Sequence, residues 1–355
     1  MKKIPRREAL RWMAVSATAF LASCQNLLRL SPTGHPTEDS THTPTNVMNP
    51  SATLTTIPTQ ATNTPERKNM STVYMTTLIN SDALMNICQI LNRKATGKVA
   101  VKISSGEPGG HHYLSPDLIA PLVREVNGTI VECNTAYGGG RANTTSHMQV
   151  IQDHGFTSIA PVDIMDADGT ISLPIAGGKH LKEDVVGSHF ANYDFVINLA
   201  HFKGHAMGGF GGVIKNMSIG IASSAGKSLI HTAGKETTGF GMNTPQDDFL
   251  ESMAEAAKGV ADYVGETIVY INVMNNLSVD CDCDSHPAAP TMQDIGILAS
   301  LDPVALDQAC MDLVYAAPDG KDLIERMESR HAIHTLEYAE EIGLGNRKYE
   351  IVTID

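Results

Sequence analysis

The chain is poor in aromatic residues and in basic residues. Aromatic side chains make up 5% of the 355 residues and include a single tryptophan, which disfavours a solenoid or a paratope rich in Tyr and Trp. The 26 Lys and Arg are outnumbered by 39 Asp and Glu, giving a formal net charge of −13. Because nucleic-acid binding relies on clustered Lys and Arg that contact phosphates, this balance argues against a nucleic-acid partner.

Long apolar runs and cysteines are also scarce. After position 30 there is no run of about 18 apolar residues, the length that crosses a bilayer, so no transmembrane helix is expected in the body. The chain has six cysteines, and residues 232–280 contain none. If one cysteine carries a lipid, five remain, an odd number that cannot all pair in disulfides within the chain.

The composition is otherwise that of a folded protein. Hydrophobic residues are 42% and charged residues 18%, which excludes disorder over the whole chain. At about 150 residues per domain, the length favours two domains.

The first 24 residues predict a twin-arginine-like lipoprotein signal peptide. A basic start is followed by an apolar run at 12–22, too short to span a bilayer. Residues 21–24 read Leu-Ala-Ser-Cys and resemble the lipobox of bacterial lipoproteins, in which the cysteine, here Cys24, is acylated; Arg6 and Arg7 resemble a twin-arginine signal. The alternative is a plain secretory peptide. We expect an exported, extracytoplasmic lipoprotein whose partner is the bacterial cell membrane, held through the lipid on Cys24.

Residues 25–70 predict a disordered linker. Eleven of the 38 residues from 31 to 68 are Thr and six are Pro, with almost no large apolar side chains to form a core. As a flexible coil such a segment spans roughly 35 Å. It is typical of a stalk that holds a folded body away from a membrane.

Residues 71–355 predict an α/β domain. Helical patterns, some with capping residues, alternate with short β-branched runs. The strands are expected at residues 98–103, 129–133, 195–200, 267–273 and 295–299. The helices are expected at residues 115–126, 143–154 and 245–264 and from about 303 onward. This alternation predicts mostly parallel sheets flanked by helices, in two lobes with a cleft between them.

The densest group of reactive residues lies at 201–231, where a predicted strand ends. Ligands of open α/β sheets usually bind at such strand ends. His205, Lys215 and His231 together offer an acid/base, a nucleophilic amine and a metal ligand. Four glycines allow the backbone to approach a ligand closely, and these are Gly208, Gly209, Gly211 and Gly212. The alternative is a flexible loop with incidental His and Lys.

Two further patterns are candidates. Cys281 and Cys283 point to the same face of an extended chain, with His286 nearby, as ligands of a soft metal would. The alternatives are an exposed acidic turn and cysteines in disulfides. His147, on the helix after a glycine-rich turn, is expected to project into the same cleft, unless it is a structural histidine.

These motifs resemble a known family. They are His201-Phe-Lys-Gly-His205, Gly-Phe-Gly-Gly at 209–212 (with Lys215-Asn216 after it), Cys-Asp-Cys at 281–283, and Asp302-Pro with Asp307. They resemble domain of unknown function 362 over residues 72–355, and more narrowly its branch of uncharacterised Fe–S centre proteins. Many members carry a ferredoxin-like insertion with four close cysteines, which this chain lacks. The resemblance then leaves Cys281 and Cys283, with Cys133 or Cys310 if the fold brings one close, to hold a cluster.

A more distant similarity is to the nickel-pincer lactate racemase family. His205, Lys215 and His231 stand ten and sixteen residues apart, as in that family. The resemblance implies a lysine, here Lys215, that is covalently attached to the cofactor, nickel ligation by His231 and acid/base roles for His205 and His147. Asn216 stands where the racemases continue with Pro-Gly, which favours a shared scaffold over shared chemistry.

The sequence therefore supports two hypotheses. The first is an enzyme with redox or racemase/isomerase chemistry, in which His147 and His205 are catalytic. Its cofactor is a metal ion, an Fe–S cluster or a nickel-type organic group, held by Lys215 and the four glycines, with metal ligands from His231, Cys281 and Cys283. Its partner is a small-molecule substrate. The second is a non-catalytic Fe–S or metal-binding module that serves an electron-transfer partner.

Overall fold

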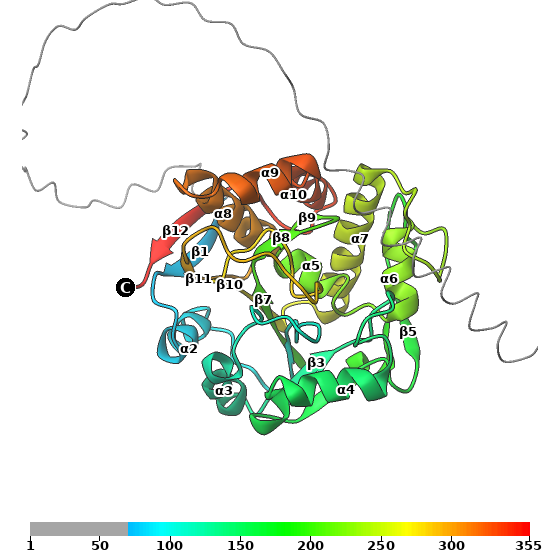
Figure 1. Cartoon of the computed structure of the whole chain (residues 1–355), viewed down its shortest axis with the longest axis horizontal. Helices are drawn as coiled ribbons and strands as arrows, with labels where there is room; N and C mark the ends of the chain where they lie inside the picture. Colours follow the sequence, from blue (N-terminus) through cyan, green and yellow to red (C-terminus); the bar gives the residue numbers. More distant parts are fainter. Residues whose placement is uncertain (1–69) are drawn as a thin grey trace, which may run out of the picture. The chain divides into compact units, whose positions relative to one another are not determined.

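The computed structural model of the protein describes residues 70–355, and its central element is an eight-stranded sheet (Figure 1). The strands across the sheet are, in order, β12 (Tyr349–Thr353), β1 (Ser71–Thr76), β11 (Gly296–Ser300), β10 (Ile268–Met274), β7 (Phe195–His201), β2 (Val99–Lys102), β3 (Thr129–Glu132) and β4 (Val162–Ile164). The predicted signal peptide with Cys24, and the linker up to residue 69, lie outside the described residues.

Most neighbouring strands of this sheet run parallel. The five strands β10, β7, β2, β3 and β4 form one parallel block. The strand β11 is antiparallel to both β10 and β1, and β1 is parallel to β12. The prediction of an α/β fold with a mostly parallel sheet is confirmed.

Both faces of the sheet are buried, which explains the continuous apolar runs in the sequence. All seven residues of β7 are buried. Because side chains alternate along a strand, Val196 and Ala200 pack into the core on one face, while Ile197 and Leu199 pack into the core on the other.

Helices cover the two faces. The face of Ile197 carries α2 (Ser81–Ile90), α3 (Pro116–Glu125) and α4 (Thr144–Asp153). The opposite face carries α5 (Val213–Met217), α7 (Gln246–Val264), α8 (Pro303–Ala316), α9 (Lys321–Ser329) and α10 (Ile333–Glu341). The remaining elements are α6 (Ser224–His231), the 3₁₀ turns at Phe156–Ser158 and Ser188–Asn192, and two small hairpins, β5 (Thr170–Pro174) with β6 (Glu183–Gly187) and β8 (Lys203–His205) with β9 (Gly209–Gly211).

The helix starts follow the local signals of the sequence. The Ser115 hydroxyl accepts a hydrogen bond from the backbone N–H of Asp117, directly before Pro116 opens α3. The Asp302 carboxylate does the same for the Val304 N–H at 2.9 Å, ahead of α8. Side-chain oxygens at this position satisfy backbone donors that the helix itself leaves free.

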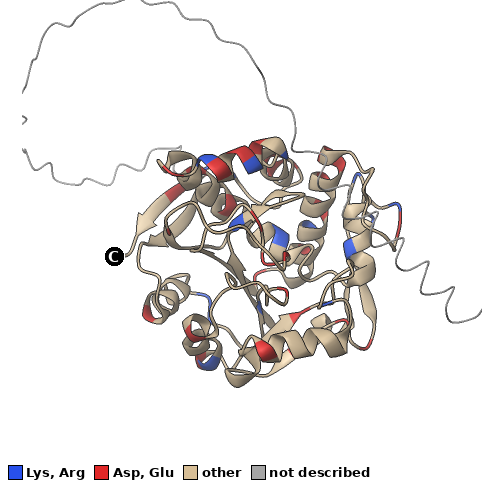
Figure 2. Ribbon diagram, viewed as in Figure 1, with Lys and Arg blue, Asp and Glu red and all other residues tan. Residues whose placement is uncertain are grey.

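The described residues belong to one compact unit. None of the helices among residues 70–355 is both long and apolar enough to cross a membrane. Figure 2 shows acidic residues along the outer helices, whereas several Lys and Arg lie near the centre of the view.

Candidate functional site

A cavity of about 660 Å³ lies at the carboxyl ends of the parallel strands β2, β3 and β7. This edge is where open α/β sheets bind ligands. The structure brings His205, Lys215, His231, Cys281 and Cys283 together around it. Further lining residues come from segments within 102–108, 132–141, 200–220, 227–240 and 280–285.

The short helix α5 carries Lys215 and is fixed at its start by a buried carboxylate. Asp307, on α8, accepts hydrogen bonds from the backbone N–H groups of Val213 and Ile214, each at 3.0 Å. A Cβ atom on Gly212 would lie 2.2 Å from Asp307 Oδ1, so a glycine is needed for this approach. Burial raises the pKa of Asp307 to about 6, although these hydrogen bonds oppose the rise. The sequence had marked Asp307 only through the family resemblance, and the structure shows that it positions Lys215.

Lys215 is half-buried, and its amine makes no hydrogen bond or ion pair with any residue that the structure describes. Burial, followed by the nearby charges of Arg141 and Lys102, lowers the pKa of Lys215 to about 8. Part of the Lys215 population is therefore uncharged and nucleophilic near neutral pH.

His205 is buried at the end of β8, and its ring is neutral. Its Nδ1 accepts a hydrogen bond from the backbone N–H of Gly208 at 2.8 Å. This bond assigns the ring proton to Nε2. Burial, followed by the charge of Lys215, holds the pKa of His205 well below its ordinary value. His205 therefore presents a proton donor toward the cavity.

His231 ends α6 with the opposite arrangement. Its Nδ1 lies 2.6 Å from the carbonyl oxygen of Lys227, so Nδ1 donates and Nε2 is left as an acceptor. The ring stacks on Phe240 and Phe249, with centroid distances of 4.2 and 5.0 Å. Burial lowers the pKa of His231 to about 4. The cavity thus contains one neutral imidazole that donates and one that can accept.

Three residues expected at the site do not line the cavity. His147 is fully buried beneath it, with Nε2 3.5 Å from Ser105 Oγ and Nδ1 3.4 Å from Asn134 Oδ1, and burial lowers its pKa to about 3. The expectation that His147 projects into the cleft is therefore wrong, because α4 directs it into the interior. Gly208 lies in the turn between β8 and β9, and Gly209 is the first residue of β9. A Cβ on Gly209 would lie 2.5 Å from that of Ala332, so this glycine serves helix packing.

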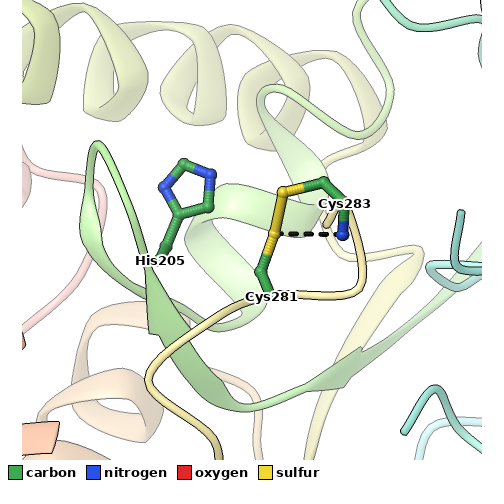
Figure 3. A group of neighbouring side chains, drawn as sticks. All are labelled: His205, Cys281 and Cys283. Carbon is green, nitrogen blue, oxygen red and sulfur yellow. Dashed lines mark hydrogen bonds between the residues drawn. A yellow bond between two sulfur atoms is a disulfide. The ribbon is translucent and has the colours of Figure 1, made fainter. Parts of the chain in front are cut away.

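The structure joins Cys281 and Cys283 in a disulfide, one of the alternatives left open by the sequence, rather than presenting two free thiolates. Figure 3 shows the His205 ring facing this disulfide, and the three side chains place their candidate ligand atoms within 4.8 Å of one another. His286 is exposed on the same loop and hydrogen-bonds to Ser285. Among the described residues, no other cysteine joins this group.

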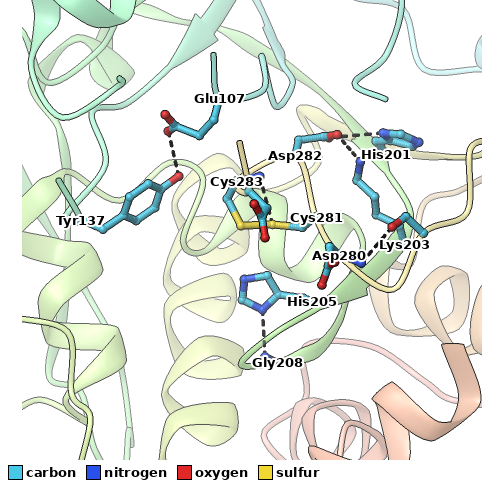
Figure 4. Close-up of a disulfide and its surroundings, with 12 residues drawn as sticks. Glu107, Tyr137, His201, Lys203, His205, Gly208, Asp280, Cys281, Asp282 and Cys283 are labelled. Carbon is cyan, nitrogen blue, oxygen red and sulfur yellow. Dashed lines mark hydrogen bonds and ion pairs between the residues drawn. A yellow bond between two sulfur atoms is a disulfide. The ribbon is translucent and has the colours of Figure 1, made fainter. Parts of the chain in front are cut away.

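The residue between the two cysteines holds their loop in place (Figure 4). Asp282 is buried, forms an ion pair with Lys203 and lies within hydrogen-bond distance of His201 Nδ1, at 3.3 Å. Its carbonyl oxygen accepts a hydrogen bond from the Glu107 N–H at 2.8 Å. With the Asp282 carboxylate directed to one side, both sulfur atoms face the cavity.

A buried ion network forms the floor of the cavity, and sequence reasoning missed it. Glu132 pairs with Lys102 at 2.9 Å and with Arg141 at 3.3 Å, and Arg141 pairs with Glu107 at 2.8 Å. Burial alone would raise the pKa of Glu132, but the two cations lower it to about 2. The sequence did contain a signal for this network, because two mostly apolar strands each end in a charged residue. These residues are Lys102 in β2 and Glu132 in β3.

A family model described as Domain of unknown function (DUF362) matches residues 99–312. This confirms the resemblance predicted from the motifs. A search of curated proteins finds no match.

Two solved structures are similar to the chain. One is the lactate racemase apoprotein from Thermoanaerobacterium thermosaccharolyticum, with 14% identity and a TM-score of 0.43 over 71% of this chain. The other is a protein from Thermotoga maritima, with 10% identity and a TM-score of 0.38 over 74% of this chain. The chain spans 58% of the length of each of these structures.

Proposed function

Since the chain belongs to the family of the domain of unknown function DUF362, whose description states no activity, we propose a function from the cavity itself. The protein is an enzyme that holds a small organic ligand or cofactor at Lys215 and exchanges protons with it through His205 and His231. The chemistry is of the racemase/isomerase or redox type.

The observation that carries this proposal is the free amine of Lys215. The other cations that line the cavity have partners: Lys102 and Arg141 pair with Glu132, Lys203 pairs with Asp282, and Lys227 donates to a backbone carbonyl. Among the described lysines that line the cavity, Lys215 is therefore the one whose amine is available to bind an anionic or electrophilic group, and its pKa is lowered. Such a lysine can grip a phosphate or carboxylate, or form a covalent bond to a carbonyl carbon.

The two histidines supply the proton exchange. His205 offers the Nε2 proton and His231 offers the Nε2 lone pair, and both rings are neutral because burial lowers their pKa values. General acid–base catalysis needs such a pair, with one group ready to donate and one ready to accept.

The donor set also fits a nickel-type organic cofactor. Lys215 would attach the organic part, and the Nε2 lone pair of His231 would then ligate the metal instead of accepting a proton. Such a group supplies hydride-accepting chemistry when it is bound.

The first experiment measures the reactivity of Lys215. The full chain is treated with a small acylating reagent across a pH series, and the modified peptides are quantified by mass spectrometry. Lys215 is expected to reach half its maximal rate near pH 8, and the exposed Lys321 serves as the control. A Lys215 profile equal to that of Lys321 would contradict the proposed role.

The second experiment tests the three roles with protein purified from its native host. Lys215→Ala is expected to keep the fold and lose any ligand that co-purifies. His205→Ala is expected to keep the ligand and lose activity, and His231→Ala to lose metal while keeping the organic part. Intact mass and elemental analysis provide the readouts. An empty cavity in the wild type, with all three variants indistinguishable from it, would refute the cofactor hypothesis.

A second candidate function is a metal-binding module for electron transfer. The observation in its favour is the group of His205, Cys281 and Cys283, whose ligand atoms lie within 4.8 Å of one another. Soft metals prefer such sulfur and imidazole donors once the cysteines are reduced. Metal that disappears in a double serine variant, but not in Lys215→Ala, would favour this function.

The proposed location is the outer face of the bacterial cell membrane. Support comes from the lipobox at 21–24, the Arg6-Arg7 pair and the Thr/Pro-rich linker of the sequence. A disulfide among the described residues is compatible with export, because disulfides persist in oxidising compartments.

A further inference from the structure

We propose that Cys281 and Cys283 form a two-electron thiol–disulfide redox centre of the cavity. It exchanges electrons with small thiols, and the Nε2–H of His205 donates a hydrogen bond that stabilises the sulfur atom that leaves. This inference goes beyond the function proposed above, because it does not depend on a ligand at Lys215.

The disulfide contributes little as a structural cross-link. A disulfide stabilises a fold mainly by closing a loop, and the effect grows with loop length. Cys281 and Cys283 are two positions apart, so this bond joins no distant parts of the chain. Stability therefore does not account for a disulfide here.

The loop that carries the pair is fixed by other contacts. Asp282 is held by Lys203, and Arg326 donates to the Val279 carbonyl oxygen at 2.5 Å and to Asp280 at 3.1 Å. Breaking the sulfur–sulfur bond leaves these contacts in place. Both thiols of the reduced form then still face the cavity, and the bond can form again without refolding of the loop.

The two sulfur atoms differ in access. Cys281 is buried, with 7% of its surface exposed, whereas Cys283 is half-buried and nearer to solvent. Thiol–disulfide exchange proceeds at the sulfur that the attacking thiolate can reach. An incoming thiol is therefore expected to attack Cys283 and to release Cys281.

His205 is placed to stabilise the sulfur that leaves. Its Nδ1 is occupied by the Gly208 N–H, so Nε2 carries the proton and faces the disulfide (Figures 3 and 4). A hydrogen bond from this N–H stabilises the charge of the leaving thiolate.

The small thiol reacts as its thiolate, having released its proton to solvent. The thiolate bonds to Cys283 Sγ and the Cys281–Cys283 bond breaks; the leaving Cys281 thiolate accepts a hydrogen bond from His205 Nε2–H and then takes a proton from solvent. A second thiolate attacks the sulfur of the bound small thiol, releases the oxidised disulfide of the small thiol and leaves Cys283, which also takes a proton from solvent. Two small thiols thus lose two electrons and two protons to the pair, and His205 keeps its proton throughout.

The test uses the full chain in glutathione buffers of varied reduced-to-oxidised ratio, with a chelator present. Samples are quenched with an alkylating reagent and weighed as intact protein. We expect two alkyl groups to be gained together, with both forms populated within the range that glutathione can buffer. Reduction achieved only after unfolding the protein would overturn the proposal.

Single variants test the direction of attack. Cys281→Ser leaves the accessible sulfur and is expected to form a glutathione adduct at Cys283 at least tenfold faster than Cys283→Ser forms one at Cys281. Equal rates in the two variants would overturn the assignment.

A matched pair of histidine variants tests the hydrogen-bond donor. His205→Ala removes the donor and is expected to slow reduction by glutathione about tenfold or more. His286→Ala, on the same loop but exposed, is expected to be reduced as fast as the wild type. Equal rates in all three proteins would overturn the role of His205. A pair that fails to cycle in protein whose Lys215 still titrates near pH 8 would overturn this inference alone and leave the proposed function standing.

Discussion

The ion network under the cavity predicts a large and pH-dependent cost for Glu132→Gln. The substitution keeps the shape of the side chain and removes its charge. Lys102 and Arg141, both buried, then lose the carboxylate that they share. Removing one partner of a buried ion pair costs about 3–5 kcal/mol, because the remaining charge is left uncompensated.

The pKa of Glu132 provides a second estimate of the same quantity. The carboxyl has an ordinary pKa of 4.5 and a folded-state pKa of about 2. At about 1.4 kcal/mol per unit, this difference corresponds to about 3 kcal/mol of folding stability. A lowered carboxyl pKa stabilises the fold above pH 4.5, and the stabilisation is lost as pH falls toward 2.

Urea unfolding of the wild type and the variant, followed at several pH values, measures the difference between their free energies of unfolding. We expect this gap to be about 3 kcal/mol at pH 7 and to shrink to roughly 1 kcal/mol at pH 3. Glu266→Gln is the control, since its carboxylate is 92% exposed and its loss should cost less than about 0.5 kcal/mol. A gap below about 1 kcal/mol at pH 7, or one that does not change with pH, would refute the reasoning.

Three further predictions follow from the other features. Gly212→Ala places a Cβ 2.2 Å from the carboxylate that fixes α5, and should destabilise the fold by about 1–3 kcal/mol in thermal unfolding, whereas Gly138→Ala, with open space around it, should not. Cys24→Ala should release the protein from membranes; protein that stays in the pellet after a salt wash would contradict the lipid anchor. For the second candidate function, the metal-binding module, the expected result is that Cys281→Ser combined with Cys283→Ser abolishes stoichiometric iron or zinc in protein from the native host, as measured by elemental analysis; unchanged metal would rule out that function.

Local signals in the sequence were sufficient for much of the fold. The strand β7 and the helix α7 were predicted within one or two residues of their bounds, because an apolar run or a 3.6-residue period is a property of neighbouring residues. The edge strand β12 was missed. Its residues are mostly exposed, so it lacks an apolar pattern, and only its pairing with β1 makes it a strand.

The site was predictable where one short segment carries the chemistry. His205, Lys215 and His231 were found because they lie in one short segment, residues 201–231, that follows a buried strand. The pairing of Lys102 with Glu132 was missed because it joins two strands through the tertiary fold. His147 was misplaced because sequence spacing does not show which side of a helix faces a cavity and which faces the interior.

The place of β1 in the sheet has a consequence for biosynthesis. Val73 lies opposite Ser300, and Ser71 opposite Tyr349, so β1 pairs with two strands that are made long after it. At translation rates of about 5–20 residues per second, β1 waits roughly 10–50 s for β11. For the last roughly 1–5 s of that time β10 has been made and also lacks β11 on one edge, which leaves a hydrophobic strand open to wrong pairing. The eight-stranded sheet is therefore complete only after residue 353 has left the ribosome. A twin-arginine route, which carries folded proteins, would accept the chain after that moment, whereas a route that threads unfolded chains would leave this late closure to the far side of the membrane.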